Sequence, residues 1–149
     1  MPQLSERPDL AVLSVGDVVA SAEYHLTRDS LVRYAGASGD FNPLHYRDDF
    51  AVAVGLPGVL AHGMLTMGLA VQCVVDWAGD PARVVDYQVR FTRPVLVDAV
   101  TGADVSVSAK VGALEADTNV ARIDLTVTSD DQTVLGKAQI RVSLAPAVS

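Results

Sequence analysis

The second half of the chain shows a regular alternation of apolar and polar residues. Four segments follow this period of two, each with its apolar residues at every second position. Such alternation is typical of half-buried strands in an antiparallel sheet. The pattern predicts strands at residues 85–91, 105–111, 123–127 and 138–144, and the sequence TSDDQT at 128–133 predicts a turn between two of them.

The first half of the chain predicts one strand and three helices. Residues 18–26 suit a strand, and Thr27 is a candidate cap for a helix over 28–37 that ends near Gly36 and Gly39. A short helix is expected over 48–54, where Gly55, Pro57 and Gly58 then break it. From Ala61 to about Trp77 the apolar residues cover the whole helical circumference, which predicts a buried helix.

One strand, a long buried helix and four further strands indicate an α+β fold. We expect a single domain over residues 1–149, in which an antiparallel sheet wraps around the long helix. Residues 1–9 and 145–149 are expected to be loosely held termini. A sheet of this kind has an open edge, so we expect the chain to pair with a second copy or a related subunit.

Composition and charge restrict the partners of this domain. The net charge of −7 and the pI near 4.7 exclude a general affinity for nucleic acid or anionic membranes, so a phosphate-bearing ligand needs a local basic patch. The longest uncharged stretch, 63–75, is shorter than the ~20 apolar residues that span a bilayer. The single cysteine, Cys73, excludes an intrachain disulfide, and the first residues lack the pattern of a secretory signal. We expect a cytoplasmic protein.

The segment GDFNPLH, residues 39–45, contains the first candidates for chemistry. Asn42 and Pro43 favour a turn that directs Asp40 and His45 toward one point. A carboxylate and an imidazole that converge on one water molecule form a general acid–base pair. The alternative is that Asp40 and Asn42 only form the turn and that His45 is an exposed loop residue.

The segment LAHGML, residues 60–65, begins the buried helix with His62 and Gly63. A glycine at a helix start leaves its N–H accessible at the positive end of the helix dipole, which suits a carbonyl oxygen that gains negative charge. In the alternative interpretation Gly63 only permits tight packing and His62 is a semi-buried structural histidine. A metal site from Asp40, His45 and His62 is chemically possible, but no ligand spacing supports it, so we expect no metal.

Two motifs together resemble a known family. YAGASGDFNPLHYRDDFA followed by GVLAHGML is similar to the MaoC-like, (R)-specific enoyl-thioester hydratases, whose members have the hot-dog fold. AHGMLTMG, WAGDP and YQVRFTRPV extend the resemblance to the catalytic subunits of mycobacterial (3R)-hydroxyacyl-ACP dehydratases. The similarity covers roughly residues 13–144.

The resemblance implies roles for particular residues. The catalytic aspartate and histidine of the family fall on Asp40 and His45, its carbonyl-polarising glycine falls on Gly63, and Asn42 shapes the site. Some members carry a serine where this chain has Val71, so no catalytic hydroxyl is expected there. The implied reaction adds water to a trans-2-enoyl thioester, or removes it from a (3R)-hydroxyacyl thioester, without a cofactor.

The resemblance also implies substrates and partners. The substrate is an acyl-ACP or acyl-CoA, its acyl chain lies beside the buried helix, and Arg90, Arg93 and Lys110 are candidates for its phosphate end, with plain surface charge as the alternative. The chain is expected to form a heterodimer with a related non-catalytic hot-dog subunit, or a homodimer. A hot-dog acyl thioesterase and a non-catalytic subunit that binds acyl chains are the alternative functions.

Overall fold

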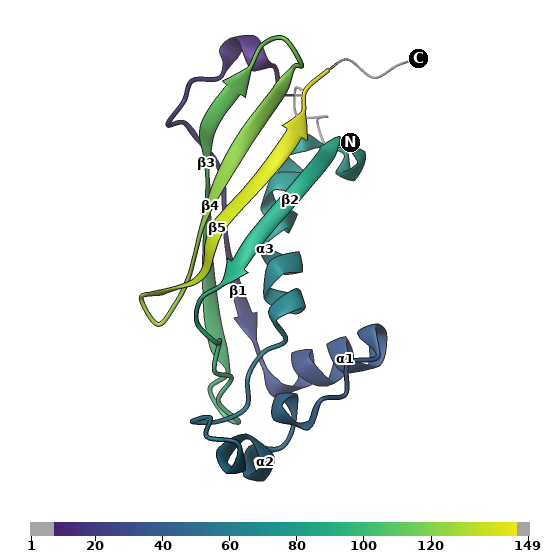
Figure 1. Cartoon of the computed structure of the whole chain (residues 1–149), viewed down its shortest axis with the longest axis vertical. Helices are drawn as coiled ribbons and strands as arrows, with labels where there is room; N and C mark the ends of the chain where they lie inside the picture. The colour runs from purple at the N-terminus through teal and green to yellow at the C-terminus, as the bar shows by residue number, and fades with distance from the viewer. Residues whose placement is uncertain (1–7, 146–149) are drawn as a thin grey trace, which may run out of the picture.

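The computed structural model describes residues 8–145 of the chain (Figure 1). Of the two termini expected to be loosely held, residues 1–7 and 146–149 lie outside the described residues. Asp9 is a described residue of the first terminus: its side chain accepts a hydrogen bond of 3.0 Å from the Ala11 N–H and thereby caps a short 3-10 helix, η1 (Leu10–Val12).

Five antiparallel strands form one sheet in the order β1-β3-β4-β5-β2, so that β1 and β2 are its two edges. Register shifts interrupt every strand pair, and such irregularities increase the local twist of a sheet. The strands are β1 (Val18–Leu26), β2 (Val84–Phe91), β3 (Ala103–Glu115), β4 (Val120–Ser129) and β5 (Gln132–Ser143).

The long helix α3 (Gly63–Ala78) lies along one face of the sheet (Figure 1). Gly79, with a φ of 75°, ends it in a left-handed cap. The core forms between α3 and the apolar residues that alternate along the strands, among them the fully buried Val105, Ile123 and Ile140. This is the expected α+β architecture, a sheet wrapped around a central helix, and it confirms the hot-dog fold.

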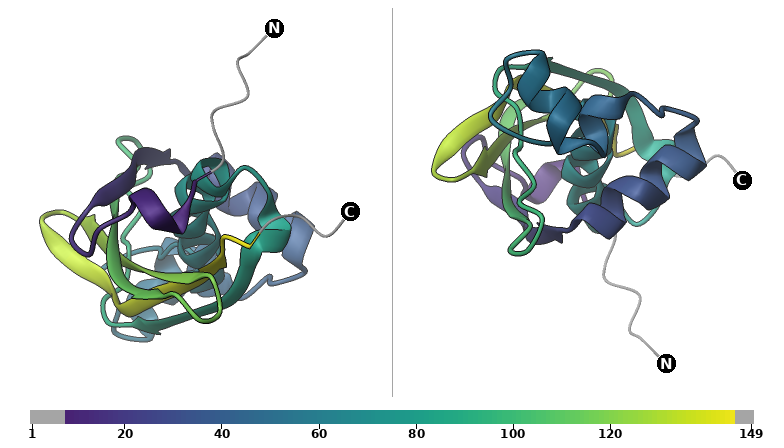
Figure 2. Two further views of the ribbon diagram at one scale, coloured as in Figure 1. Left: turned by 90° about the horizontal axis from the view of Figure 1, so that it is seen from above. Right: turned by 90° about the horizontal axis from the view of Figure 1, so that it is seen from below.

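Helices α1 (Arg28–Ser38) and α2 (Asp48–Ala53) gather at the end of the sheet where α3 begins (Figures 1 and 2). A bidentate ion pair joins them, with N···O distances of 2.8 and 3.1 Å between the Arg28 guanidinium and the Asp48 carboxylate. The segment between the two helices contains a 3-10 turn, η2 (Pro43–His45), and a third such turn, η3 (Pro81–Arg83), precedes β2. The chain thus brackets residues 39–47 between two helices that hold each other in place.

The predicted elements are present; the strand at 18–26 has the predicted bounds, whereas the long helix and the four later strands have different ones. Helix α3 begins two residues later than expected because Ala61 precedes the helix and donates a hydrogen bond of 2.8 Å to the Val95 carbonyl. Strand β3 extends beyond the predicted 105–111 at both ends. Among residues 8–145, no helix is long and apolar enough to cross a membrane.

Candidate active site

Asp40 follows α1 and is fixed by local hydrogen bonds. Gly39, with a φ of 78°, ends the helix in the left-handed conformation and turns the chain. The Asp40 N–H then donates to the Ser38 hydroxyl (3.1 Å), and the Asp40 Oδ1 accepts from the Asn42 N–H (3.2 Å). One carboxylate oxygen is therefore engaged in the turn, and Oδ2 is left to face the site.

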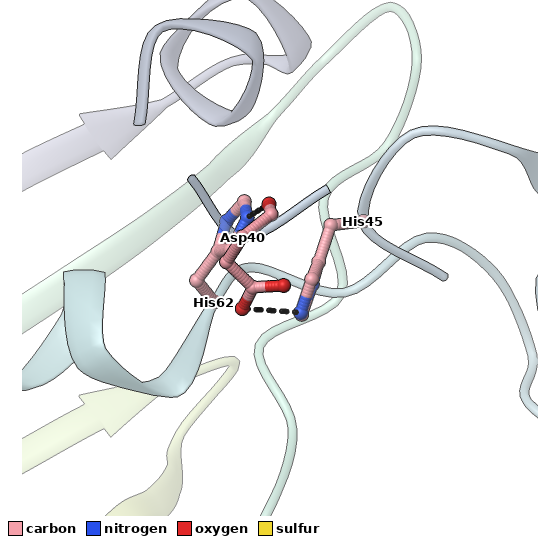
Figure 3. Close-up of side chains that lie close together, drawn as sticks. All are labelled: Asp40, His45 and His62. Atoms are coloured by element: carbon pink, nitrogen blue, oxygen red, sulfur yellow. Dashed lines mark hydrogen bonds and ion pairs between the residues drawn. The ribbon is translucent and has the colours of Figure 1, made fainter. Parts of the chain in front are cut away.

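His45 ends the 3-10 turn that Asn42 and Pro43 start. The Asn42 side chain accepts from the Leu44 N–H at 3.3 Å and caps the turn, with Pro43 at its first position. The His45 Nδ1 lies 2.7 Å from the Leu60 carbonyl, which can only accept, so Nδ1 carries the proton and neutral His45 has its lone pair on Nε2. This Nε2 lies 3.9 Å from the Asp40 Oδ2 (Figure 3).

Burial of the imidazole lowers the pKa of His45 below its ordinary value of 6.5. The hydrogen bond to the Leu60 carbonyl opposes this shift, the neighbouring His62 adds to it, and the Asp40 carboxylate opposes it. The net effect is a lowered pKa, which favours the neutral form of the His45 ring. Near neutral pH, His45 is therefore able to accept a proton on Nε2.

His62 is buried behind this pair, with 1% of its surface exposed. Its Nε2 donates to the backbone carbonyl of Asp40 at 3.1 Å (Figure 3). Its ring stacks on His45, with 3.8 Å between the ring centroids and 22° between the planes. It also meets the Tyr34 ring of α1 in a T-shaped contact, at a centroid distance of 4.7 Å.

Gly63 is the first residue of α3, and no side chain caps this end of the helix. The first helical hydrogen bonds are those from the Leu65 and Thr66 N–H groups to the His62 carbonyl, so the N–H of Gly63 has no partner within the helix. A Cβ on Gly63 would lie 3.0 Å from the Phe91 ring. The absence of a side chain keeps this N–H accessible at the positive end of the helix dipole.

A cavity of ≈ 280 Å³ opens beside His45 and Gly63. Its walls are mostly apolar, and the polar side chains among them are His45, Thr66, Thr92 and Arg93. Thr66 is only 3% exposed and lies one helical turn after Gly63. The remaining lining residues are Leu60, Ala61, Phe91, Pro94, Val95, Val134 and Leu135.

Arg90, Arg93 and Lys110, the three candidates for the phosphate end of the substrate, lie apart in the structure. Arg93 lines the cavity and donates to the Thr133 carbonyl at 3.3 Å. Arg90 lines a different hollow, of ≈ 440 Å³, together with Lys137, which the sequence did not single out. Lys110 lies on β3, which β4 and β5 separate from β2. Asp40, Asn42, Pro43, His45, His62 and Gly63, by contrast, lie together.

The cluster of Asp40, His45 and His62 does not suit a metal ion, although their candidate ligand atoms lie within 4.8 Å of one another. A metal lies near the plane of each imidazole that binds it, about 2.0–2.1 Å from the nitrogen. Two rings stacked at 3.8 Å do not direct their lone pairs at one point in this way. The Nε2 of His62 is also engaged by the Asp40 carbonyl.

Three residues of the site escaped the sequence analysis. Thr66 is recognisable in retrospect, because residues three apart on a helix share a face and Gly63 had been singled out. Tyr34 and Phe91 carry no such signal, since each reaches the site only through the packing of distant segments.

Comparison with known proteins gives consistent matches. Residues 13–130 match the family model described as the MaoC like domain. The chain is 37% identical to 3-hydroxyacyl-thioester dehydratase X of Mycobacterium tuberculosis over 82 residues, which are 55% of this chain and 28% of that protein. It is 38% identical to the peroxisomal enoyl-CoA hydratase 2 of Arabidopsis thaliana over 60 residues, 39% of this chain and 19% of that one.

A solved structure of a MaoC-like dehydratase superposes with a TM-score of 0.90 and 37% identity, over 93% of this chain and 43% of the other. The chain therefore spans less than half the length of each of these relatives. The relatives named as dehydratases and hydratases are hydro-lyases.

Proposed function

Since the chain belongs to the family of the MaoC-like domain, we propose that it is a hydro-lyase that acts on acyl thioesters. It dehydrates (3R)-hydroxyacyl thioesters and, in the reverse direction, hydrates trans-2-enoyl thioesters. The observation that carries this proposal is the position of the Asp40 Oδ2, 3.9 Å from the His45 Nε2, where His45 lines an apolar cavity. The intact pair argues against a purely substrate-binding subunit.

The separation of Asp40 and His45 supports joint binding of one water molecule. A distance of 3.9 Å is too long for a direct hydrogen bond, but both atoms can accept from a water that lies against them. In hydration, the water oxygen bonds to the β-carbon of the enoyl thioester while the pair takes up one proton. Delivery of one proton to the α-carbon balances the addition, and dehydration reverses these steps.

Gly63 is proposed to contact the thioester carbonyl oxygen of the substrate. Addition at the β-carbon moves negative charge onto the thioester oxygen, and the free Gly63 N–H at the uncapped start of α3 donates to it. The positive end of the helix dipole favours the same charge. Acid–base addition to a conjugated thioester needs no metal and no organic cofactor.

The substrate carries its acyl chain in the apolar cavity and its phosphates outside. Arg93 is the best supported of the three basic candidates for the phosphates, because it is the one whose position next to the cavity brings it near a substrate held there. Arg90 and Lys110 remain proposals with weaker support, since neither lines it. Acyl-CoA and acyl-ACP share the phosphopantetheine arm, and both are candidate substrates.

A second hot-dog unit is the proposed partner. Strand β2 is an edge of the sheet, and Val85 and Phe91 on it are each 55% exposed. Pairing along this edge covers these side chains and completes the hydrogen bonding of the strand. The partner is a related non-catalytic subunit or, failing that, a second copy of this chain.

A spectrophotometric assay of the purified chain tests the reaction. Crotonyl-CoA, longer enoyl-CoAs and the matching enoyl-ACPs are expected to lose enoyl absorbance without release of free thiol, and chiral analysis is expected to find the (3R) product. Release of thiol would identify a thioesterase instead. A (3S) product, or no turnover of any of these thioesters with or without a related hot-dog subunit, would reject the proposal.

A further inference from the structure

His62 contacts each of the three groups to which the proposed chemistry gives a role. Its Nε2 donates to the Asp40 backbone carbonyl, and its ring stacks on His45. Its own carbonyl accepts the first hydrogen bonds of α3, directly before Gly63. Asp40 and His45 come from one segment of the chain and Gly63 from another, and His62 contacts both segments.

The hydrogen bonds of His62 define its tautomer. The Asp40 carbonyl can only accept, so the Nε2 of His62 carries the proton. Its Nδ1 is buried and has no hydrogen-bond partner among the described residues. A second proton on Nδ1 would therefore have no acceptor and would place a positive charge against the His45 ring.

We propose that His62 is a positioning residue, which sets the place of the Asp40 carboxylate relative to the His45 ring. The proposal rests on the proposed hydro-lyase function. In this role His62 makes no contact with the substrate. Its effect reaches the reaction only through the two residues that hold the water.

The surroundings of His45 agree with this role. Three groups face its ring: the Asp40 carboxylate across 3.9 Å, the Leu60 carbonyl at Nδ1, and the stacked His62. Tyr34, on α1, makes a T-shaped contact with the His62 ring. His62 acts in the same direction as burial on the pKa of His45, whereas the Leu60 carbonyl and Asp40 act against both.

Two substitutions separate the hydrogen bond from the ring. His62→Gln keeps an N–H donor near the position of Nε2 and removes the ring, whereas His62→Phe keeps a stacked ring and removes the donor. We expect His62→Phe to lose ~10-fold to ~10²-fold in kcat with little change in KM, because misplacement of a reacting group by about 1 Å costs rates of this order. His62→Gln is expected to retain clearly more of kcat.

The dependence of kcat/KM on pH distinguishes this role from a purely structural one, which would leave the profile unchanged. In both variants the acid limb of kcat/KM is expected at higher pH than in the wild type, because the His62 imidazole, which lowers the pKa of His45, is removed. His25→Phe is the matched control. His25 lies on the edge strand β1, pairs with Asp104 of β3, and does not line the cavity. It should leave kcat and the profile unchanged.

Nitrogen NMR of the wild-type imidazoles tests the same idea without a substitution. His62 is expected as the Nε2–H tautomer and His45 as the Nδ1–H tautomer. The opposite tautomer on His62 would overturn the proposal even if both variants fail to fold. So would full kcat and an unshifted acid limb in a folded His62→Phe, whereas a wild-type chain without hydro-lyase activity would overturn the proposed function instead.

Discussion

Asp40 and His45 are held by separate hydrogen bonds, to Asn42 and Ser38 in one case and to Leu60 in the other. Removal of either side chain therefore leaves the anchor of its partner in place. We expect Asp40→Asn and His45→Ala each to reduce turnover by at least the ~10²-fold typical of a lost general acid or base. Steady-state hydration kinetics and thermal unfolding together measure the effect.

Asp117→Asn and His25→Ala are the matched controls for this pair. Asp117 lies in the turn between β3 and β4, and His25 lies on β1, so neither belongs to the cavity. Both should retain wild-type turnover. Near-normal activity of either Asp40→Asn or His45→Ala would remove that residue from the mechanism.

The pKa of His45 leads to an expected pH dependence. Burial lowers this pKa below 6.5, and only the neutral ring accepts a proton, so activity should fall on acidification with a midpoint below 6.5. A profile of kcat/KM against pH for the free enzyme gives this midpoint. A midpoint above 6.5 would show that the ring is stabilised in its charged form.

Gly63→Ala tests the access to the helix start. The new Cβ would lie 3.0 Å from the Phe91 ring and beside the N–H that is proposed to meet the thioester oxygen. We expect kcat to fall, at most by the ~10²–10³-fold cost of a lost oxyanion donor. Thermal unfolding should change little, because the new Cβ meets only the end of the Phe91 side chain, which can shift, and no backbone atom. Unchanged kcat would exclude the Gly63 N–H from the reaction.

At the scale of elements, α1 carries Tyr34 and leads directly into Asp40, and its start is capped by Thr27. The Thr27 hydroxyl accepts from the Ser30 N–H, and the Ser30 hydroxyl accepts from the Thr27 N–H. Thr27→Ala should lower the free energy of unfolding by about 1 kcal/mol, and the Tm by ~2–4 °C. Thr27→Ser keeps the oxygen and should stay near the wild type; equal losses in both variants would contradict the cap.

The sequence predicted these elements well where a local signal marks them. The strand at 18–26 and the start of α1 at Arg28 match the structure, because alternation and the cap at Thr27 are local features. The predicted helix start at Ala61 is two residues early, since its apolar side chain does not distinguish Ala61, which bonds to the Val95 carbonyl, from the helix that follows.

The candidate site shows the same division. The motifs indicated Asp40, His45, His62 and Gly63 because all four lie in two short segments. The bond from the His62 Nε2 to the Asp40 carbonyl spans 22 positions and depends on how α3 packs against the preceding loop. No periodicity in the sequence encodes such a contact.

For the molecule as a whole, the exposed edge at β2 is the basis of the proposed pairing. Val85→Arg places a charge on this edge and is expected to convert a dimer into a monomer in size-exclusion chromatography with light scattering. Val100→Arg is the control, because Val100 is 93% exposed and lies in the turn that precedes β3, outside the strand β2. A wild-type chain that is a stable monomer with full activity on long enoyl thioesters would defeat the pairing.

The same pairing has a consequence for how such proteins can evolve. Asp40, His45 and Gly63 all belong to the segment between α1 and the first turn of α3, so one unit carries every residue to which the proposed mechanism gives a role. After a gene duplication, an assembly of two units holds two sets where one suffices for turnover. The second copy is then released from selection on these residues and is free to change its own cavity, while the first continues to catalyse.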